Sequence, residues 1–379
     1  MTACRSCERA ELFVEAVEAR LRALLSAERD RWEMRYPSLR MGFDAVESFV
    51  LGGGKRLRPR FVFWGHEAAL WGHDARRERA GGAALVDLGA AVELFHAFAL
   101  IHDDVMDDSD TRRHAPTVHH RFATLHQRRG WSGERRRVAE AFAVLLGDLA
   151  FAYSTQLLSE LPPRTRTLFD AMRIELHVGQ YLDLVGAADA APAHELEAQA
   201  DDIGRLKTAT YSVERPLHLG SALADAQHLD GCWSAYGTAV GEAFQLRDDL
   251  LDVFGDPAVT GKPVGQDLNA GTSTPLIRHT LSAASAWNAA RGEGDGEPGG
   301  TEQTAALDAL RRLGSGTLQG PDVAAVGVFM QACGAVSQVE ARIHELIGQA
   351  NRTLAEAPIS PEVRHGLSAM AETAAWRDR

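Results

Sequence analysis

The sequence predicts an all-α protein, and three observations carry that prediction. Alanine, leucine, glutamate and arginine dominate the 379 residues, whereas threonine, isoleucine and tyrosine, which favour strands, are sparse. Apolar residues recur at helical spacing among charged ones in most segments. The chain is also long enough to bury a substantial core. We therefore expect residues 1–379 to form a single domain, one large helical bundle around a central cavity.

The composition narrows the class of partner and the location. A net charge of −12 argues against nucleic-acid binding, yet it leaves room for a small anion held by a local cluster of cations. No export signal is apparent, so we expect a cytoplasmic protein. The most apolar stretch, 82–101, approaches membrane-spanning length but contains Asp87, Glu93 and His96. A buried core helix, without stable membrane insertion, is the better interpretation.

The N-terminal part of the chain predicts a tail followed by two helices. Residues 1–10 are expected to be mobile, and their Cys4 and Cys7 lack the second ligand pair of a structural zinc site. From 11 to about 34, apolar residues at helical spacing predict an amphipathic covering helix. A shorter helix should then lead to Leu51.

A glycine-rich and basic motif, GGGKRLRP, follows the second helix. Its three glycines, 52–54, end that helix and free backbone N–H groups to approach an anion. Three cations stand beside them: Lys55, Arg56 and Arg58. Pro59 suits the first turn of the next helix, expected at about 60–71. Taken alone, the motif is as well explained by a basic helix start on the surface.

The helix expected at about 81–108 is apolar until it ends in carboxylates. Residues four apart share a helix face, so Asp103 pairs with Asp107. Asp104 and Asp108 form a second pair beside the first. Carboxylates this close raise one another's pKa or need a counter-charge, and oxygen-only ligands suit Mg²⁺, which prefers carboxylates plus substrate phosphates. For one such run alone, a solvated acidic helix end is the alternative.

The rest of the chain is expected to add helices that complete the bundle. Their approximate ranges are 134–161, 164–186, 194–223, 321–354 and 361–376. Residues 291–303 are rich in glycine and acid and have no periodicity, which predicts a mobile surface insertion between helices.

A second acidic motif, FQLRDDLLD, strengthens the interpretation of the first as a metal site. It again ends an apolar helix, and Asp248 and Asp252 lie four apart with Asp249 between them. Two acidic helices aimed at one cavity would hold several Mg²⁺ ions. The predicted metal ligands are Asp103, Asp104, Asp107, Asp248, Asp249 and Asp252. The cations that a bound diphosphate needs are Lys55, Arg56, Arg58, Arg112, Arg113, Lys207 and Lys262. Together they predict a diphosphate site for two substrates.

The chain resembles the trans-isoprenyl diphosphate synthases, also called polyprenyl synthetases, and is most similar to bacterial geranylgeranyl diphosphate synthases. The likeness rests on GGGKRLRP, on HDDVMDDSDTRR followed by PTVH, on GQYLD, on KTATYSVERPLHLG, and on FQLRDDLLD with GKPVGQD. These motifs cover roughly residues 51–275. The resemblance implies an isoprenoid-synthase-type bundle, homodimer assembly, and Mg²⁺-dependent head-to-tail condensation of isopentenyl diphosphate with an allylic diphosphate.

The resemblance also implies a role for each motif residue. The substrate-binding residues are Lys55, Arg58, His96 and Arg113 for isopentenyl diphosphate, and Arg112, Lys207, Thr208, Gln245 and Lys262 on the allylic side. The residues implied in catalysis are Asp103, Asp107, Asp248, Arg112, Lys207, Thr208, Gln245 and Lys262. Thr208 and Gln245 would lie near the carbocation. The released diphosphate itself would take the proton.

Product length is expected to depend on the helix before the first motif. The tail of the growing chain must extend back from Asp103 toward Phe98, about 7.5 Å along the axis, and Phe95, one turn deeper. In the resembled family, an aromatic residue five before the motif and a small one four before it go with a C20 product. Phe98 and Ala99 occupy those positions, so we expect geranylgeranyl diphosphate. The alternative is that Phe98 is simply core.

Two departures from the family pattern and three rival functions remain. His114 stands where the family has the glycine of RRG, and Thr272 stands where it has a lysine. A farnesyl diphosphate synthase is the nearest rival. A class I terpene cyclase would have no use for GGGKRLRP, and a non-catalytic partner subunit should have lost aspartates that this chain keeps.

Overall fold

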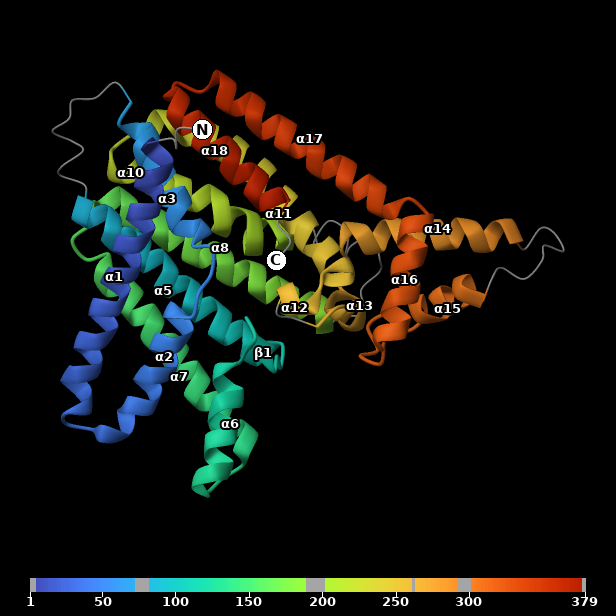
Figure 1. Cartoon of the computed structure of the whole chain (residues 1–379), viewed down its shortest axis with the longest axis horizontal. Coiled ribbons are helices and arrows are strands. Elements are labelled where there is room, and N and C mark those ends of the chain that lie inside the picture. The colour runs from blue at the N-terminus through green and yellow to red at the C-terminus, as the bar shows by residue number, and fades with distance from the viewer. Residues whose placement is uncertain (1–4, 72–81, 189–201, 261–262, 292–300, 377–379) are drawn as a thin grey trace. The chain divides into compact units, whose positions relative to one another are not determined.

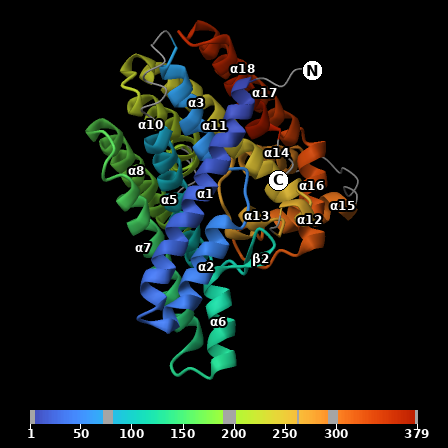
Figure 2. The ribbon, with the colours of Figure 1, turned by 60° about the vertical axis from the view of Figure 1, so that its left-hand side comes forward.

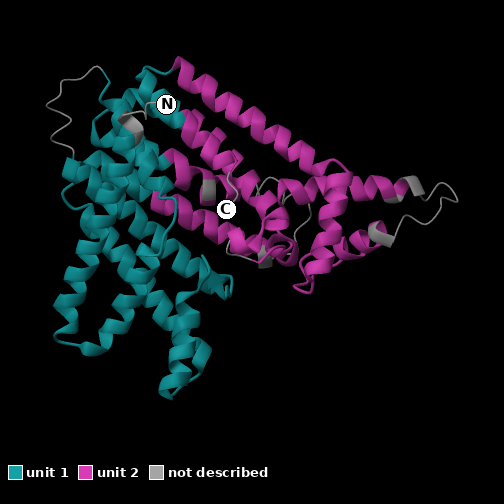
Figure 3. Ribbon diagram, viewed as in Figure 1, with its two compact units in different colours: residues 1–171, 215–233, 357–367 teal, residues 172–214, 234–356, 368–379 magenta. Residues whose placement is uncertain are grey.

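The structure, a computed structural model, describes residues 5–71, 82–188, 202–260, 263–291 and 301–376. Helices form 82% of it and strands 1%, which confirms the all-α prediction. Figure 1 gives the order of the elements. The chain divides into two compact units: unit 1 comprises 1–171, 215–233 and 357–367, and unit 2 comprises 172–214, 234–356 and 368–379 (Figure 3). The single-domain expectation stays a prediction.

Unit 1 contains the N-terminal helices and the first acidic motif. Its elements are α1 (Arg5–Glu33), η1 (Pro37–Leu39), α2 (Arg40–Leu51), α3 (Leu57–Ala69), α5 (Gly82–Met106), β1 (Thr111–Arg112), β2 (Ala115–Pro116), α6 (Val118–Arg129), α7 (Arg135–Leu157), the first part of α8 (Pro163–Ala188), α10 (Arg215–Leu223) and η3 (Gln227–Leu229). Its helix α5 contacts α1, α2, α3, α6, α7 and α10. Most of α5 is buried, as predicted for the apolar stretch 82–101.

Unit 2 contains the second acidic motif and most C-terminal helices. Its elements are the rest of α8, the π-helix η2 (Arg205–Glu214), most of α11 (Asp230–Phe254), α12 (Pro257–Thr260), α13 (Gln266–Ala270), α14 (Pro275–Arg291), α15 (Thr301–Leu310), α16 (Gly320–Ala332), α17 (Ala335–Glu356) and the end of α18 (Pro361–Ala375). Helices α14, α16 and α17 pack on one another, and α15 packs on α16.

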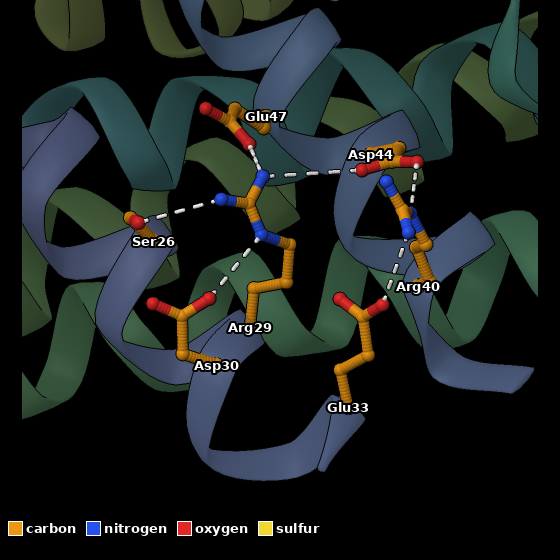
Figure 4. Close-up of polar contacts among 7 residues, drawn as sticks. All are labelled: Ser26, Arg29, Asp30, Glu33, Arg40, Asp44 and Glu47. Carbon is orange, nitrogen blue, oxygen red and sulfur yellow. Dashed lines mark hydrogen bonds and ion pairs between the residues drawn. The ribbon is translucent and has the colours of Figure 1, made fainter. Parts of the chain in front are cut away.

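An ion-pair cluster holds α1 and α2 together as a helical hairpin. The two helices lie side by side in Figures 1 and 2. Arg29, near the end of α1, donates from Nη1 to Glu47 on α2 at 2.7 Å and lies 4.0 Å from Asp44. Arg40 pairs with Glu33 at 3.4 Å and with Asp44 at 3.8 Å (Figure 4). The cluster is partly exposed, so it sets the geometry of the hairpin more than its stability.

Two glycines let α3 and α10 approach backbone to backbone. A Cβ added at Gly65 would overlap the carbonyl of Leu217, and one at Gly220 would overlap that of Val62. Gly220 ends the motif KTATYSVERPLHLG. Its place in the motif therefore has a packing reason, close helix contact, besides any role in binding.

Several predicted helix boundaries need correction. The first helix begins at Arg5 and Ala10 is buried, so residues 5–10 belong to α1 and not to a tail. Residues 1–4, with Cys4, lie outside the described chain, as do 292–300 of the predicted insertion. The helix expected at 321–354 is two helices, α16 and α17, which meet at 67°. The break falls at Gly334, whose φ of +80° suits glycine.

The segment expected as one helix at 194–223 is also different. Residues 189–201 lie outside the described chain, and 205–214 form a π-helix that continues into α10. By length and apolar composition, two of the described helices, α5 and α7, qualify as candidate membrane spans. Of the apolar window in α5, 67% is buried inside the structure, against 39% in α7.

Candidate functional site

The first acidic motif is placed by the last turn of α5. Asp107 follows the helix end, and its backbone N–H donates to the carbonyl of Asp103 at 2.8 Å. Asp104 is only 1% exposed and accepts a hydrogen bond from Arg112 Nε at 2.7 Å. Arg112 Nη2 also lies 3.5 Å from Asp103 Oδ2. One arginine thus supplies the counter-charge that two adjacent carboxylates need.

A short hairpin directs the two arginines of the motif to different partners. Strands β1 and β2 pair Arg112 with Ala115, which leaves Arg113 and His114 as a two-residue loop, both at positive φ. Arg112 turns to the aspartates, whereas Arg113 Nη1 donates to the carbonyl of Gly53 at 2.5 Å. The hairpin therefore joins the acidic motif to the glycine loop. The sequence did not predict these strands.

The predicted cations of unit 1 gather around His96 on α5. Arg58 Nη1 lies 3.1 Å from His96 Nε2. Burial, followed by the positive charges of Arg58 and Arg113, holds the pKa of His96 well below its usual value. The imidazole is therefore neutral, and its Nε2 accepts from the guanidinium. Arg58, His96 and Arg113 thus come together, with Lys55 in the same loop, and their role in binding an anion stays a prediction.

Arg56 does not belong to that group, although the sequence suggested it as a diphosphate ligand. Its guanidinium is buried: Nη1 donates to Glu93 at 2.6 Å and Nε to Glu18 at 3.0 Å. Nη2 donates to the carbonyl of Val50 at 2.8 Å. The suggestion was wrong because the guanidinium of Arg56 is buried and held by these three partners. Arg56 instead anchors the glycine loop to α5 and α1, and its backbone adopts the left-handed conformation.

Four phenylalanines form one aromatic cluster on the α5 side of the motif. Phe95 stacks on Phe98 at 5.6 Å between ring centroids. Phe151 of α7 meets Phe98 at 5.1 Å, and Phe169 of α8 meets Phe95 at 5.9 Å. The sequence pointed to Phe95, Phe98 and Ala99 alone. It carried no signal for Phe151 and Phe169, which come from other helices.

The second acidic motif, in unit 2, has a different environment. Asp248 is exposed, whereas Asp249 is 2% exposed and accepts from Gln245 Nε2 at 2.9 Å. Its other oxygen, Oδ2, has no hydrogen-bond partner among the described residues. Burial and then the nearby charge of Asp267 raise the pKa of Asp249 well above its usual value. Burial thus favours the protonated form of Asp249 over the charged one.

Asp252 closes the loop that follows the second motif. Its two carboxylate oxygens accept from the backbone N–H groups of Gln266 at 3.0 Å and Asp267 at 3.1 Å. Its carbonyl accepts from the N–H of Gly265 at 2.7 Å. Predicted as a metal ligand, Asp252 thus also caps α13. Lys262, the predicted allylic ligand of this loop, lies outside the described residues.

The π-helix η2 presents Lys207 beside α8. Lys207 Nζ donates to Asp183 Oδ2 at 2.7 Å, so the last residue of GQYLD holds this lysine. Gly179 of the same motif permits the approach, because a Cβ there would lie 3.0 Å from Leu206 Cβ and Lys207 N. GQYLD is one of the motifs on which the family resemblance rests, but the sequence alone suggested no role for it. The side chain of Thr208 lies outside what is described.

In the part of the chain that the structure describes, the candidate metal ligands do not form a preformed cage. Among the described residues, no three His, Cys, Asp or Glu side chains converge as a metal site. Mg²⁺ does not need such a cage, since one or two carboxylates plus substrate phosphates hold it. Asp103 and Asp107 in unit 1, and Asp248 in unit 2, offer carboxylates of this kind. These residues fit Mg²⁺, and their roles as ligands stay predictions.

Comparison with known proteins points to one family. The polyprenyl synthetase family matches residues 42–294. A geranylgeranyl diphosphate synthase from Sulfolobus acidocaldarius is 34% identical over 248 residues, which are 63% of this chain and 66% of that protein. A farnesyl diphosphate synthase from Haemophilus influenzae is 31% identical over 275 residues, 69% of this chain and 82% of that protein. The chain thus spans just under two thirds of the length of the first of these relatives.

Among solved structures, the likeness extends over nearly the whole chain. The crystal structure of geranylgeranyl pyrophosphate synthase from Corynebacterium glutamicum, complexed with isoprenyl diphosphate and magnesium, is 34% identical with a TM-score of 0.82. The match covers 96% of this chain and 98% of that one. It confirms the predicted isoprenoid-synthase-type fold.

Proposed function

The chain belongs to the polyprenyl synthetase family, and from that premise we propose that it condenses isopentenyl diphosphate with an allylic diphosphate. One observation carries the proposal. On α3, α5 and the hairpin after α5, a group of Arg58, His96 and Arg113 that suits an anion lies beside the carboxylates of Asp103 and Asp104. A diphosphate that keeps its negative charge suits the first group. Mg²⁺ held by the second would stabilise the charge of a diphosphate that must leave.

In the proposed reaction, the C–O bond of the allylic diphosphate breaks first. Mg²⁺, when bound by Asp103, Asp107 and Asp248, supplies positive charge at the departing oxygens. Arg112, held by Asp104, and Lys207, held by Asp183, bring N–H donors whose orientation is already set by a carboxylate. Such preorganised donors stabilise charge without further rearrangement.

Carbon–carbon bond formation follows. The alkene of isopentenyl diphosphate attacks the allylic cation, and the released diphosphate takes the proton that is lost. Lys55, Arg58, His96 and Arg113 are proposed to hold the isopentenyl diphosphate while this happens. Thr208 and Gln245 are proposed to lie near the cation, and Lys262 to bind the allylic diphosphate. No side chain is needed as a nucleophile.

Geranylgeranyl diphosphate is proposed as the main product. Support comes from Phe98, which is nearly buried and sits in the aromatic cluster with Phe95 and Phe151. A chain that grows back along α5 would meet this wall. The named relatives include both geranylgeranyl and farnesyl diphosphate synthases at similar identity, so similarity alone does not choose between the two lengths.

Two substitutions test the product length. Phe98→Ala should lengthen the product by at least one five-carbon unit, and Ala99→Phe should shorten it. Phe122→Ala is the matched control, because Phe122 also stacks in unit 1, on Phe142 at 4.5 Å, away from the cluster. It should leave the product unchanged. An identical product distribution in wild type and both variants would assign the chain-length limit elsewhere.

A direct assay tests the reaction itself. Purified protein is incubated with Mg²⁺, isopentenyl diphosphate and each of three allylic primers, and the products are identified by chromatography. We expect linear prenyl diphosphates, with the C20 product dominant. A cyclic hydrocarbon made from geranylgeranyl diphosphate alone would favour a class I terpene cyclase. No turnover with any primer would favour a non-catalytic partner subunit.

Homodimer assembly in the cytoplasm is proposed as well. On α8 of unit 2, Ile174, Val178, Tyr181 and Val185 follow one another at helical spacing and are all exposed. An apolar stripe of this kind fits a second copy of the chain. One chain has a mass of 41.1 kDa. Light scattering coupled to size-exclusion chromatography should give twice this mass for the wild type and a lower mass for Tyr181→Lys.

A further inference from the structure

His102 stands directly before the first acidic motif and is fixed by two helices. Its Nε2 lies 3.1 Å from the carbonyl oxygen of Val144 on α7. Since a carbonyl only accepts, Nε2 carries the hydrogen and donates it. Asp148 Oδ1 lies 3.6 Å from the same nitrogen. On the other side, the ring packs on Phe98, one turn earlier in α5, with 4.5 Å between ring centroids.

Gly147 of α7 provides the space into which this imidazole fits. A Cβ built on Gly147 would overlap both Cδ2 and Nε2 of His102. Only a glycine therefore allows the ring to reach the backbone of α7 at this level. The space at Gly147, called the notch below, lies beside the carbonyl of Val144 that accepts the hydrogen bond from His102. The contact is therefore specific in shape as well as in hydrogen bonding.

We propose that His102 and Gly147 position the first acidic motif. His102 lies one residue before Asp103, so its direction from the helix axis is related to that of Asp103 by a fixed rotation of about 100°. Seating the ring in the notch sets the rotation and depth of the last turn of α5. That turn in turn sets where the carboxylate of Asp103 points. His102 is a positioning residue, and nothing requires it to touch a substrate.

The proposal rests on the proposed function, since it concerns the aspartates assigned to Mg²⁺ and diphosphate. Its test uses three variants: Gly147→Ala, His102→Ala and the double variant. A methyl group at 147 would push the ring out by roughly 1 Å, and a misplacement of that size is enough to cost about 10²-fold in rate. Removing the His102 ring makes room for the methyl group at 147. The double variant therefore shows whether Gly147→Ala acts through its clash with His102 or through an unrelated change in the structure.

Gly89→Ala is the matched control for crowding. Gly89 also lies on α5, where an added Cβ would be 2.8 Å from Val17 Cγ2 and 2.9 Å from Phe13 Cζ of α1. It is several turns away from the motif. The substitution should lower the thermal midpoint, as a packing fault does, and leave metal binding unchanged.

The first readout is binding of Mn²⁺, used in place of Mg²⁺, with inorganic diphosphate, followed by electron paramagnetic resonance. We expect Gly147→Ala to raise the Mn²⁺ dissociation constant at least fivefold and to lower kcat at least tenfold. The KM for isopentenyl diphosphate should change less than twofold. The double variant should bind Mn²⁺ as His102→Ala does, within twofold.

Two results would overturn the inference: unchanged Mn²⁺ binding in Gly147→Ala, or effects of the two single variants that multiply in the double one. The first of these results, accompanied by a lower thermal midpoint, would show a packing fault alone. The Mn²⁺ readout needs no turnover. Wild-type protein that binds Mn²⁺ as expected but forms no prenyl product would therefore reject the proposed function and leave the positioning role standing.

Discussion

The two acidic motifs have the same sequence pattern, DDxxD, but their second aspartates lie in different electrostatic environments. In each, the second aspartate is almost completely buried, Asp104 at 1% and Asp249 at 2% exposure. Asp104 meets the guanidinium of Arg112, whereas Asp249 meets the neutral amide of Gln245. A buried carboxylate is kept charged by a cation and is neutralised without one. The motif is the same at this position and the partner differs, and burial without a cation raises the pKa of Asp249.

The third aspartates differ as well. Asp107 follows the end of α5, and its side chain is exposed. Asp252 lies within α11 and uses both carboxylate oxygens to hold the backbone of Gln266 and Asp267. The first motif is therefore built around a charge pair, and the second around a loop cap. Equal spacing of aspartates in a sequence does not imply equal roles.

The largest expected effect concerns the first aspartate of each motif, where the two should behave alike. Asp103→Ala and Asp248→Ala should each reduce turnover by about 10²-fold or more, because each removes an oxygen that stabilises charge at the diphosphate. Circular dichroism should show unchanged helix content. Asp108→Ala is the control, since Asp108 is exposed beyond the helix end. Near-normal turnover in both variants would contradict the two-motif mechanism.

The second aspartates should separate the motifs most clearly. Asp104→Asn should lower the free energy of unfolding by about 2 kcal/mol, because it leaves the mostly buried Arg112 with only its longer contact to Asp103 as a charged partner. Asp249→Asn should change it by less than about 1 kcal/mol near pH 7, since an amide replaces a carboxyl group whose raised pKa favours the neutral form. Urea denaturation of both variants gives the comparison. Equal losses would mean that the two sites share one charge state.

The pH dependence of stability should follow from the same difference. The raised pKa of Asp249 means that the folded state holds a proton that the unfolded state releases above about pH 4. Wild type should therefore lose stability, relative to Asp249→Asn, as pH rises from about 4. The slope is at most about 1.4 kcal/mol per pH unit, until the folded-state pKa is passed. A flat difference between pH 4 and 8 would show Asp249 to be ionised.

The sequence predicted those features that depend on residues close together in the chain, and it missed those that depend on residues far apart. The helices around both motifs follow from local periodicity, and so does the pairing of residues four apart. The partner of a buried group does not. Arg112 reaches Asp104 through a hairpin, and Lys207 reaches Asp183 across two helices. Such partners are set by tertiary packing, which a pattern in one sequence does not contain.

The same limit explains the mistaken elements. The π-helix η2 packs with Ala209 so close to Gly241 of α11 that a Cβ on Gly241 would overlap it. The wider helical turn accompanies this tertiary contact, and the local composition gives no sign of it. Arg56 was misread for a related reason, because its acidic partners Glu18 and Glu93 lie 38 and 37 residues away.

The smallest expected effect concerns the turns that follow the two motifs. After the second motif, the residue with positive φ that Asp252 holds is a glycine, Gly265 at +78°. After the first, the two-residue hairpin loop uses Arg113 at +51° and His114 at +63°. Both central residues of such a turn need positive φ, a conformation that costs a non-glycine residue about 1 kcal/mol.

His114→Gly should therefore stabilise unit 1 by up to about 1 kcal/mol, reduced by the greater freedom of glycine in the unfolded chain. Arg113 is not a suitable site for the same change, because its guanidinium holds Gly53. Thermal unfolding should show a midpoint raised by roughly 1–3 °C for a chain of this size. The KM for isopentenyl diphosphate should stay within twofold, since His114 donates to none of the assigned ligands in the contacts described. A lower midpoint would mean that the His114 side chain stabilises the hairpin by more than its backbone strain costs.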